Sequence, residues 1–160
     1  MTIKTGDRMP AGKFKIMGEK GPLDLTSAEL FDGKRVVLFS VPGAFTPTCS
    51  AKHLPGFLEQ EAALHGKGID TIACMAVNDV FVMSAWGKSA NAADKVKMLA
   101  DGNGEYAKAL GLELDARGFG MGVRGQRFAL VVDNGVASKV FIEAAGEFKV
   151  SAAEYVLAQL

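Results

Sequence analysis

The stretch Arg35-Val-Val-Leu-Phe-Ser-Val41 is a short run of β-branched and aromatic residues bounded by glycine and proline. Such a run is typical of a buried β-strand. The turn-rich segment Pro42–Cys49 follows, and Ser50–His65 then carries apolar residues at mostly helical intervals. The next apolar run, Ile69–Val77, again has the composition of a strand. The order strand, loop, helix, strand predicts a βαβ unit of an α/β sheet.

Two details refine this unit. Pro55 lies inside the expected helix over 50–65, and because proline lacks a backbone N–H, we expect a kink or a displaced start there. A further helix is predicted after the second strand, with Asn78 or Asp79 as its cap and its end near Lys88.

The last third of the chain changes pattern. Arg127–Asp133 and Val136–Ile142 flank Asn134-Gly135, which predicts an antiparallel β-hairpin with a type I′ turn. Ser151–Leu160 is expected to form a closing helix, with Ser151 as cap and Glu154 completing a capping box. Together these elements predict an α/β, thioredoxin-like fold with a central mixed β-sheet flanked by helices, as a single domain over residues 1–160.

Composition limits the possible functions. The chain has 160 residues, 49% of them hydrophobic, with 18 basic and 18 acidic side chains. This excludes a disordered chain and a bulk electrostatic attraction to nucleic acid or anionic membrane. No apolar run approaches the roughly 18 residues that span a bilayer, and the first residues lack the apolar region of a secretory signal. Two cysteines are too few for a disulfide framework. Because no secretory signal is recognised, we expect a soluble, cytoplasmic protein.

Cys49 is the candidate reactive residue. It ends the strand-to-helix loop near the start of a helix, where unpaired N–H groups and the helix dipole favour a thiolate. The hydroxyls of Thr46 and Thr48 are close in sequence and can hydrogen-bond beside the sulfur. The alternative is an inert cysteine that fills core volume. Because Cys49 follows a loop rich in proline, glycine and threonine, we favour the reactive cysteine.

These residues also carry a family resemblance. Pro42-x-x-x-Thr46-x-x-Cys49 resembles the active-site signature of peroxiredoxins, and the longer Val41–Phe57 string is similar to the type II, or peroxiredoxin-5-like, subfamily. Ala76–Gly87 and Arg127–Asp133 agree with the same subfamily, so the resemblance covers nearly the whole chain.

The resemblance implies a role for each residue of the motif. Cys49 would attack the peroxide O–O bond and become a sulfenic acid. Thr46 would hydrogen-bond the sulfur and the peroxide, Arg127 would hold the thiolate and polarise the peroxide, and Pro42 would shield the sulfur from water. Arg124 is the rival for the arginine role, although it does not match the family pattern. The reaction requires no metal, flavin or other cofactor beyond a thiol reductant.

The sequence leaves the reducing step open. No cysteine lies near the C-terminus, so Cys74 is the only internal candidate to resolve the oxidised Cys49. Because Cys74 lies in a buried-strand run, we favour a structural role for it and an external reductant, either glutathione with glutaredoxin or thioredoxin. The resemblance also implies a homodimer, to which Phe45 and Phe81 would belong unless they simply pack in the core.

Other signals carry less weight. Gly120-x-Gly122-x-x-Gly125 matches a dinucleotide-binding pattern, but a strand rather than a helix follows it, so nucleotide binding is rejected. His53 and His65 lack the spacing of a metal site. His53 lies four residues after Cys49, close enough to face the site, but we favour a surface or packing role over that of a base. A redox sensor or chaperone with a switch cysteine is the alternative function. A thiol–disulfide oxidoreductase is disfavoured because no Cys-x-x-Cys is present.

Overall fold

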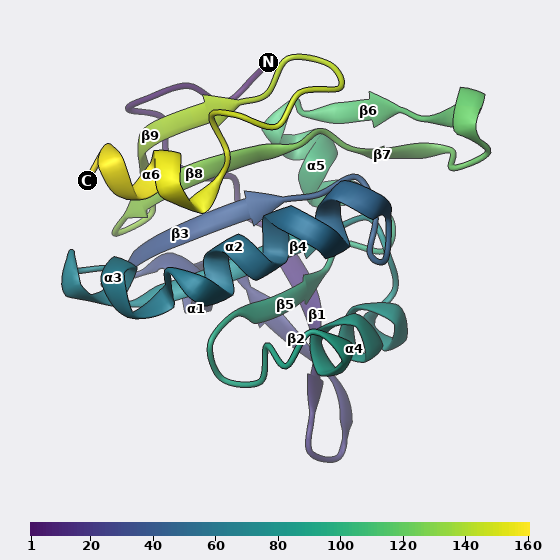
Figure 1. Cartoon of the computed structure of the whole chain (residues 1–160), viewed down its shortest axis with the longest axis horizontal. Helices are drawn as coiled ribbons and strands as arrows, with labels where there is room; N and C mark the ends of the chain where they lie inside the picture. Colours follow the sequence, from purple (N-terminus) through teal and green to yellow (C-terminus); the bar gives the residue numbers. More distant parts are fainter.

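A seven-stranded β-sheet forms the centre of the computed structural model, which describes residues 1–160 (Figure 1). Its strand order is β2-β1-β5-β4-β3-β8-β9. The strands are β1 (Lys13–Gly18), β2 (Gly21–Thr26), β3 (Arg35–Ser40), β4 (Thr71–Ala76), β5 (Lys97–Ala100), β8 (Phe128–Asp133) and β9 (Val136–Ile142). The pairs β3–β4 and β4–β5 are parallel and the other pairs are antiparallel, so the expected mixed sheet is confirmed.

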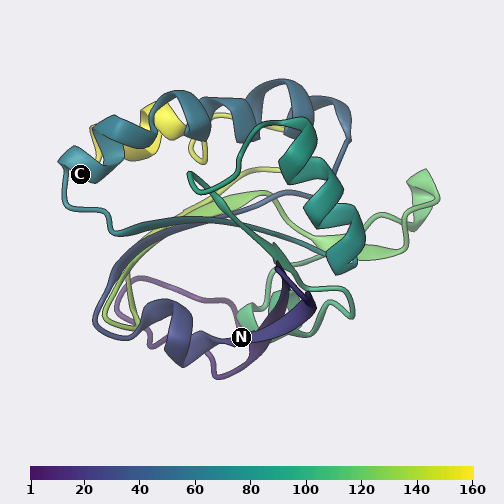
Figure 2. The same cartoon turned by 90° about the horizontal axis from the view of Figure 1, so that it is seen from below.

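Helices cover both faces of the sheet (Figure 2). One face carries α2 (Leu54–Glu59), α3 (Glu61–Gly66), α4 (Val80–Ser89) and α6 (Ala153–Ala158), and the other carries α1 (Ser27–Phe31) and α5 (Glu105–Leu110). None of these helices is long and apolar enough to cross a membrane.

Alternate strand residues build two separate cores. Phe39 and Cys74 face α2, α4 and α6 in the first core, which also contains Cys49 and which we call the active-site core. Leu38 and Met75, their neighbours in sequence, face α1 and α5 in the second, which we call the opposite core. This division follows from the two-residue period of a strand, which sends consecutive side chains to opposite faces.

The hairpin prediction is confirmed. Asn134 and Gly135 connect β8 to β9 with φ values of 46° and 82°, the positive values that a type I′ turn requires. The Asn134 side chain also accepts a hydrogen bond of 2.7 Å from the Gly33 N–H, so the turn is fixed to the loop before β3.

The helix expected over 50–65 is interrupted. A π-helical turn, Cys49–His53, precedes α2, and Gln60 separates α2 from α3. The position of the first break has a physical cause: Pro55 has no N–H to continue an α-helical pattern, and its ring would clash with the carbonyl four residues earlier. The wider π turn directly before it avoids that conflict.

The capping box expected at Ser151 is wrong. Helix α6 begins at Ala153 with Ala152 as its cap, and no side chain caps it. The hydroxyl of Ser151 instead donates to Glu143 Oε2 at 2.6 Å. The buried carboxylate therefore takes the hydroxyl that the sequence pattern assigned to the helix end.

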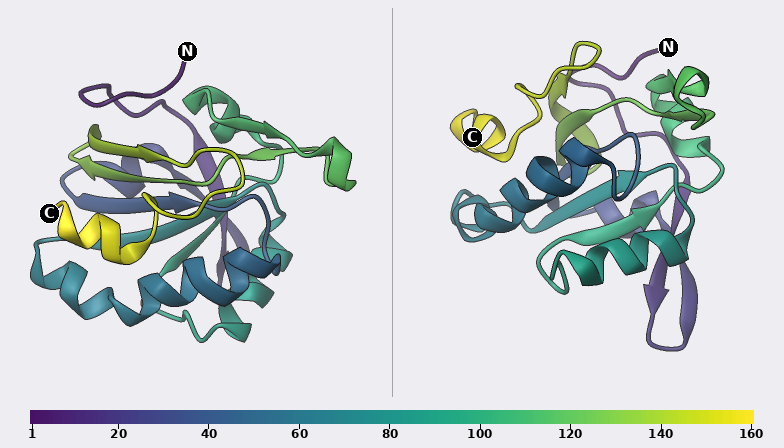
Figure 3. Two further views of the ribbon diagram at one scale, coloured as in Figure 1. Left: turned by 45° about the horizontal axis from the view of Figure 1, so that its top comes forward. Right: turned by 45° about the vertical axis from the view of Figure 1, so that its right-hand side comes forward.

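A two-stranded ribbon projects from the main body (Figure 3). It consists of β6 (Glu113–Asp115) and β7 (Val123–Gly125), joined through the 3₁₀ turn η2 (Arg117–Phe119). Phe119 at its tip is 85% exposed.

Candidate active site

Two hydrogen bonds that involve side chains fix the loop between β3 and the π turn. Near its start, the Ala44 N–H donates to Asn78 Oδ1 at 2.9 Å, which ties the loop to the segment before α4. Further along, the Thr46 hydroxyl donates to the Gly43 carbonyl at 2.7 Å. A Cβ on Gly43 would lie 3.1 Å from Arg124 Nη1 and 3.2 Å from Thr46 Cγ2, so the loop packs too closely for a larger residue to enter without displacement.

Cys49 lies in the first turn of the helical segment that follows this loop. Helical backbone begins at Pro47, and the Ser50 N–H already donates to the Thr46 carbonyl at 2.9 Å. The Cys49 carbonyl accepts from the Leu54 N–H, the five-residue step of the π turn. The predicted position of Cys49 at a helix start is therefore confirmed.

Arg127 contacts the sulfur directly. It lies just before β8, the strand next to β3, and its Nη2 donates to Cys49 Sγ at 3.2 Å. Cys49 is fully buried, whereas Arg127 is half-buried. The positive charge of Arg127 has no acidic partner to neutralise it, so it is available to a negative charge that develops on a substrate at the sulfur.

Arg124 has a different position. Its Nε donates to the Met121 carbonyl at 2.8 Å and its Nη1 to the Pro42 carbonyl at 3.4 Å. Arg124 thus links the β7 ribbon to the loop, and it is Arg127 that donates to the sulfur.

The expected hydrogen bond from Thr46 to the sulfur is not formed. The hydroxyl proton of Thr46 is directed to the Gly43 carbonyl, as described above. A hydroxyl has one proton but two lone pairs, so Thr46 Oγ1 keeps acceptor capacity toward a substrate hydroxyl. Pro42 is half-buried at the start of the same loop and supplies the carbonyl that accepts from Arg124.

His53 is the residue that the sequence reasoning undervalued. It is fully buried, its Nδ1 lies 2.9 Å from Arg127 Nη1, and its Nε2 lies 2.9 Å from the Ser151 carbonyl oxygen. The expectation of a surface histidine is wrong. His53 does pack in the interior, but packing does not account for its two polar contacts. The available signal was the four-residue spacing from Cys49, which puts both residues on one side of a helical turn.

Cys74 lies in the middle of β4, opposite Phe39 of β3 in the parallel register. It is fully buried and, like Cys49, a free cysteine. Burial, followed by interaction with Cys49, raises the pKa of Cys74 well above its ordinary value. A thiol that stays protonated is a poor nucleophile, so the geometry agrees with a structural Cys74.

The remaining candidates lie outside this cluster. Gly120 and Gly122 belong to the β6–β7 ribbon and open no helix, which agrees with the rejection of nucleotide binding. No three His, Cys, Asp or Glu side chains lie close enough to hold a metal ion. Phe45 and Phe81 are 52% and 64% exposed, so core packing does not explain them.

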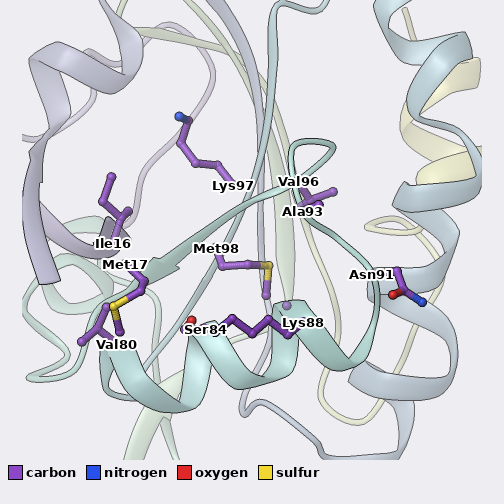
Figure 4. A pocket seen from close by; sticks show the side chains of 11 residues that line it. Ile16, Met17, Val80, Ser84, Lys88, Asn91, Ala93, Val96, Lys97 and Met98 are labelled. Carbon is purple, nitrogen blue, oxygen red and sulfur yellow. The ribbon is translucent and has the colours of Figure 1, made fainter. Parts of the chain in front are cut away.

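A cavity of about 470 Å³ lies between β1, α4 and β5 (Figure 4). The side chains of Met17, Val80 and Met98 line it together with Lys88 and Lys97. None of the residues around the Cys49 sulfur contributes to its lining, so the chemistry of the sulfur is separate from this cavity.

Comparisons with known proteins give matches over nearly the whole chain. A family model described as Redoxin matches residues 4–157. Peroxiredoxin-2B of Arabidopsis thaliana is 49% identical over 159 residues, covering 99% of this chain and 98% of the relative. The structure of reduced Prx3 from Vibrio vulnificus in complex with H₂O₂ is 48% identical, with a TM-score of 0.95 and 99% of each chain covered. Peroxiredoxin 5 from Alvinella pompejana is 35% identical, with a TM-score of 0.86 over 98% of this chain and 96% of that one.

Proposed function

Since this chain belongs to the peroxiredoxin family, in its type II or peroxiredoxin-5-like subfamily, we propose that it reduces hydrogen peroxide and small organic hydroperoxides through a sulfenic acid on Cys49. Thiol-dependent peroxidase activity follows from the family. The observation that carries the choice of residue is the 3.2 Å contact between Arg127 Nη2 and Cys49 Sγ.

The first step is a displacement at oxygen. The Cys49 thiolate attacks one peroxide oxygen, an S–O bond forms and the O–O bond breaks. The sulfur is oxidised by two electrons, and the other oxygen leaves as hydroxide or alkoxide, which takes up a proton from solvent. Arg127 stabilises the negative charge as it moves from sulfur to the leaving oxygen, and Thr46 Oγ1 accepts a hydrogen bond from the peroxide.

The second step returns Cys49 to the thiolate. We propose that a thiol of an external reductant attacks the sulfenic sulfur, forms a mixed disulfide and releases water. A second thiol then breaks this disulfide and regenerates Cys49. Glutathione with glutaredoxin, or thioredoxin, has the required chemistry. The burial and raised pKa of Cys74 support an external reductant over an internal one.

A second copy of the chain is the proposed partner. Phe45 and Phe81 are both exposed. Their segments are neighbours, since the N–H of Ala44, next to Phe45, donates to Asn78, which lies shortly before α4. Exposed aromatic side chains of this kind are typical of protein interfaces. We expect Phe81→Asp to lower the mass seen by light scattering from that of a dimer to that of a monomer. The two free cysteines also agree with a reducing compartment, and we propose the cytoplasm.

Peroxide turnover tests the function. Wild type, Cys49→Ser and Cys74→Ser would be assayed with separate glutathione/glutaredoxin and thioredoxin systems, and the oxidised proteins weighed by intact mass spectrometry. We expect Cys49→Ser to be inactive and Cys74→Ser to turn over like wild type. A wild-type loss of two hydrogens, with Cys74→Ser stalled at one added oxygen, would instead make Cys74 the resolving residue.

The alternative function is a redox sensor or chaperone in which Cys49 is only a switch. The unneutralised charge of Arg127 beside the sulfur favours catalysis over this alternative, since a passive scaffold needs no such group. Stoichiometric consumption of peroxide in the presence of both reductant systems would support the sensor.

A further inference from the structure

A chain of polar contacts leads from the sulfur into the protein. Cys49 Sγ accepts from Arg127, the other arm of Arg127 reaches His53, and His53 reaches the Ser151 carbonyl. Ser151 in turn donates its N–H and its hydroxyl to Glu143 Oε2, at 2.9 and 2.6 Å. The segments involved come from four separate parts of the sequence.

The chemistry of arginine fixes the protonation of His53. A guanidinium has only donors, so Arg127 Nη1 donates and His53 Nδ1 must accept with a bare lone pair. The single ring proton is therefore on Nε2, which donates it to the Ser151 carbonyl. His53 is neutral in this arrangement, and protonation of Nδ1 would put a proton where Arg127 donates.

Burial supports the same protonation state. Burial, and after it the positive charge of Arg127, lowers the pKa of His53 to about 3, although the Ser151 carbonyl and Glu143 act in the opposite direction. His53 therefore cannot serve as a base that carries a proton away from Cys49 at neutral pH. Cys49, Arg127 and Glu143, together with Cys74 in β4, are the titratable groups around this chain of contacts.

Aromatic rings keep the imidazole in one orientation. The ring centroid of His53 lies 4.8 Å from that of Phe39 in β3, 5.7 Å from that of Phe57 in α2 and 4.9 Å from that of Phe148 in the loop before α6. Arg127 also lies over Phe148, with Cζ 5.8 Å from the ring centroid. Because the rings restrict rotation of the imidazole, Nδ1 stays directed at the guanidinium.

We propose that His53 is a positioning residue for the peroxidase reaction, which holds the Arg127 guanidinium so that one arm points at Cys49 Sγ. The role rests on the proposed function of Cys49. Glu143 extends it, because its carboxylate fixes the loop whose Ser151 carbonyl binds His53. Without Nδ1 as an acceptor, the flexible arginine side chain loses a charge-assisted hydrogen bond and can rotate away from the sulfur.

Two substitutions separate positioning from packing. In His53→Asn, the side-chain oxygen lies near the position of Nδ1 and can still accept from Arg127. In His53→Gln, the amide lies near the position of Nε2, so the contact with Ser151 is retained and the acceptor for Arg127 is lost. Both variants reduce the volume of the imidazole, and Asn reduces it more than Gln, so a packing role predicts the larger loss for His53→Asn, whereas positioning predicts the larger loss for His53→Gln.

Two measurements would be made on each variant whose circular dichroism matches wild type. The first is the second-order rate constant with hydrogen peroxide, and the second is the pH profile of Cys49 alkylation by iodoacetamide. For His53→Gln we expect a peroxide rate about 10- to 100-fold lower, because a hydrogen bond to a charged group is lost, and an alkylation profile shifted to higher pH. His53→Asn should restore most of both.

The proposal is overturned if His53→Gln matches wild type in both measurements, or if His53→Asn loses as much activity as His53→Gln or more. The alkylation arm keeps the test independent of the proposed function: it reports the contact between Arg127 and the Cys49 sulfur even in a protein that consumes no peroxide. A wild type without turnover, combined with a shifted profile in His53→Gln alone, would reject the peroxidase and retain the positioning role.

Discussion

Protonation of His53 should make the stability of this protein fall steeply in mild acid. In the unfolded chain the histidine binds a proton below about pH 6.5, whereas in the folded protein it does so only near pH 3. Between these values the unfolded state holds one more proton than the folded state, so stability present at neutral pH is lost as the pH falls. The slope for one group is about 1.4 kcal/mol per pH unit.

The corresponding experiment is urea unfolding of reduced wild type and His53→Asn at several pH values between 7 and 4.5. Between pH 6.5, where the unfolded histidine is half protonated, and pH 4.5, the wild-type free energy of unfolding should drop by about 2 kcal/mol more than that of the variant, which lacks the titrating group. Burial acts to raise the pKa of Glu143, but hydrogen bonds from Ser151 and Lys149 together outweigh it and lower that pKa below its ordinary value, so Glu143 loses its contribution only at lower pH.

Subtracting the two curves cancels the groups that both proteins share. Parallel curves for wild type and variant across this pH range would refute the assignment of a buried neutral imidazole. So would a wild type that gains stability as the pH falls.

Four further outcomes follow from contacts in the structure. Arg127→Lys places a single ammonium where the two arms of the guanidinium contact His53 and Cys49. The second-order rate constant with peroxide, measured by stopped flow, should fall by about 10-fold or more. An unchanged rate would mean that the reaction does not need the two-armed guanidinium. Glu143→Gln weakens the hydrogen bonds from Ser151 and Lys149, and urea unfolding at pH 7 should show a loss of about 1–3 kcal/mol, whereas no loss would mean that the loop is held by other contacts. Gly111 has a φ of +73°, and a Cβ at this position would overlap with the Met1 carbonyl. The thermal midpoint of Gly111→Ala should therefore fall further than that of Gly33→Ala, where φ is +69° and the space is open. Equal losses would mean that the N-terminus moves away freely. Cys74→Ser should stay folded but lose thermal stability, because it buries a hydroxyl in the active-site core, and a thermal midpoint equal to that of wild type would contradict this placement.

Local patterns in the sequence predict the elements between residues 35 and 89 and the hairpin of β8 and β9, but they do not predict the sheet strands β1, β2 and β5 or the helices α1 and α5. Strand β3, the hairpin of β8 and β9 and the cap at Asp79 each depend on a few adjacent residues. The capping box at Ser151 failed because its hydroxyl bonds to Glu143, which is eight residues away and belongs to another segment. A pattern of a few adjacent residues contains no information about such a competing acceptor.

The active site shows the same division. Cys49 follows from its loop and Arg127 from the family pattern, but no spacing connects Arg127 to His53, 74 positions apart. The contact exists because β8 pairs with β3 and places the arginine beside the π turn. The family resemblance and its closeness in sequence both predict that Thr46 hydrogen-bonds the sulfur, whereas the tight loop directs its proton to the Gly43 carbonyl.

The separation of the two cores by the sheet has a consequence for how this protein can change over generations. The sulfur, its arginine contact and the histidine behind it all depend on the active-site core, whereas Leu38 and Met75 pack on the far side of the strands. Volume-conserving substitutions around Leu38 or Met75 can adjust heat tolerance with little effect on the position of Cys49. Adaptation to temperature and tuning of reactivity can therefore proceed as largely independent evolutionary paths within one small domain.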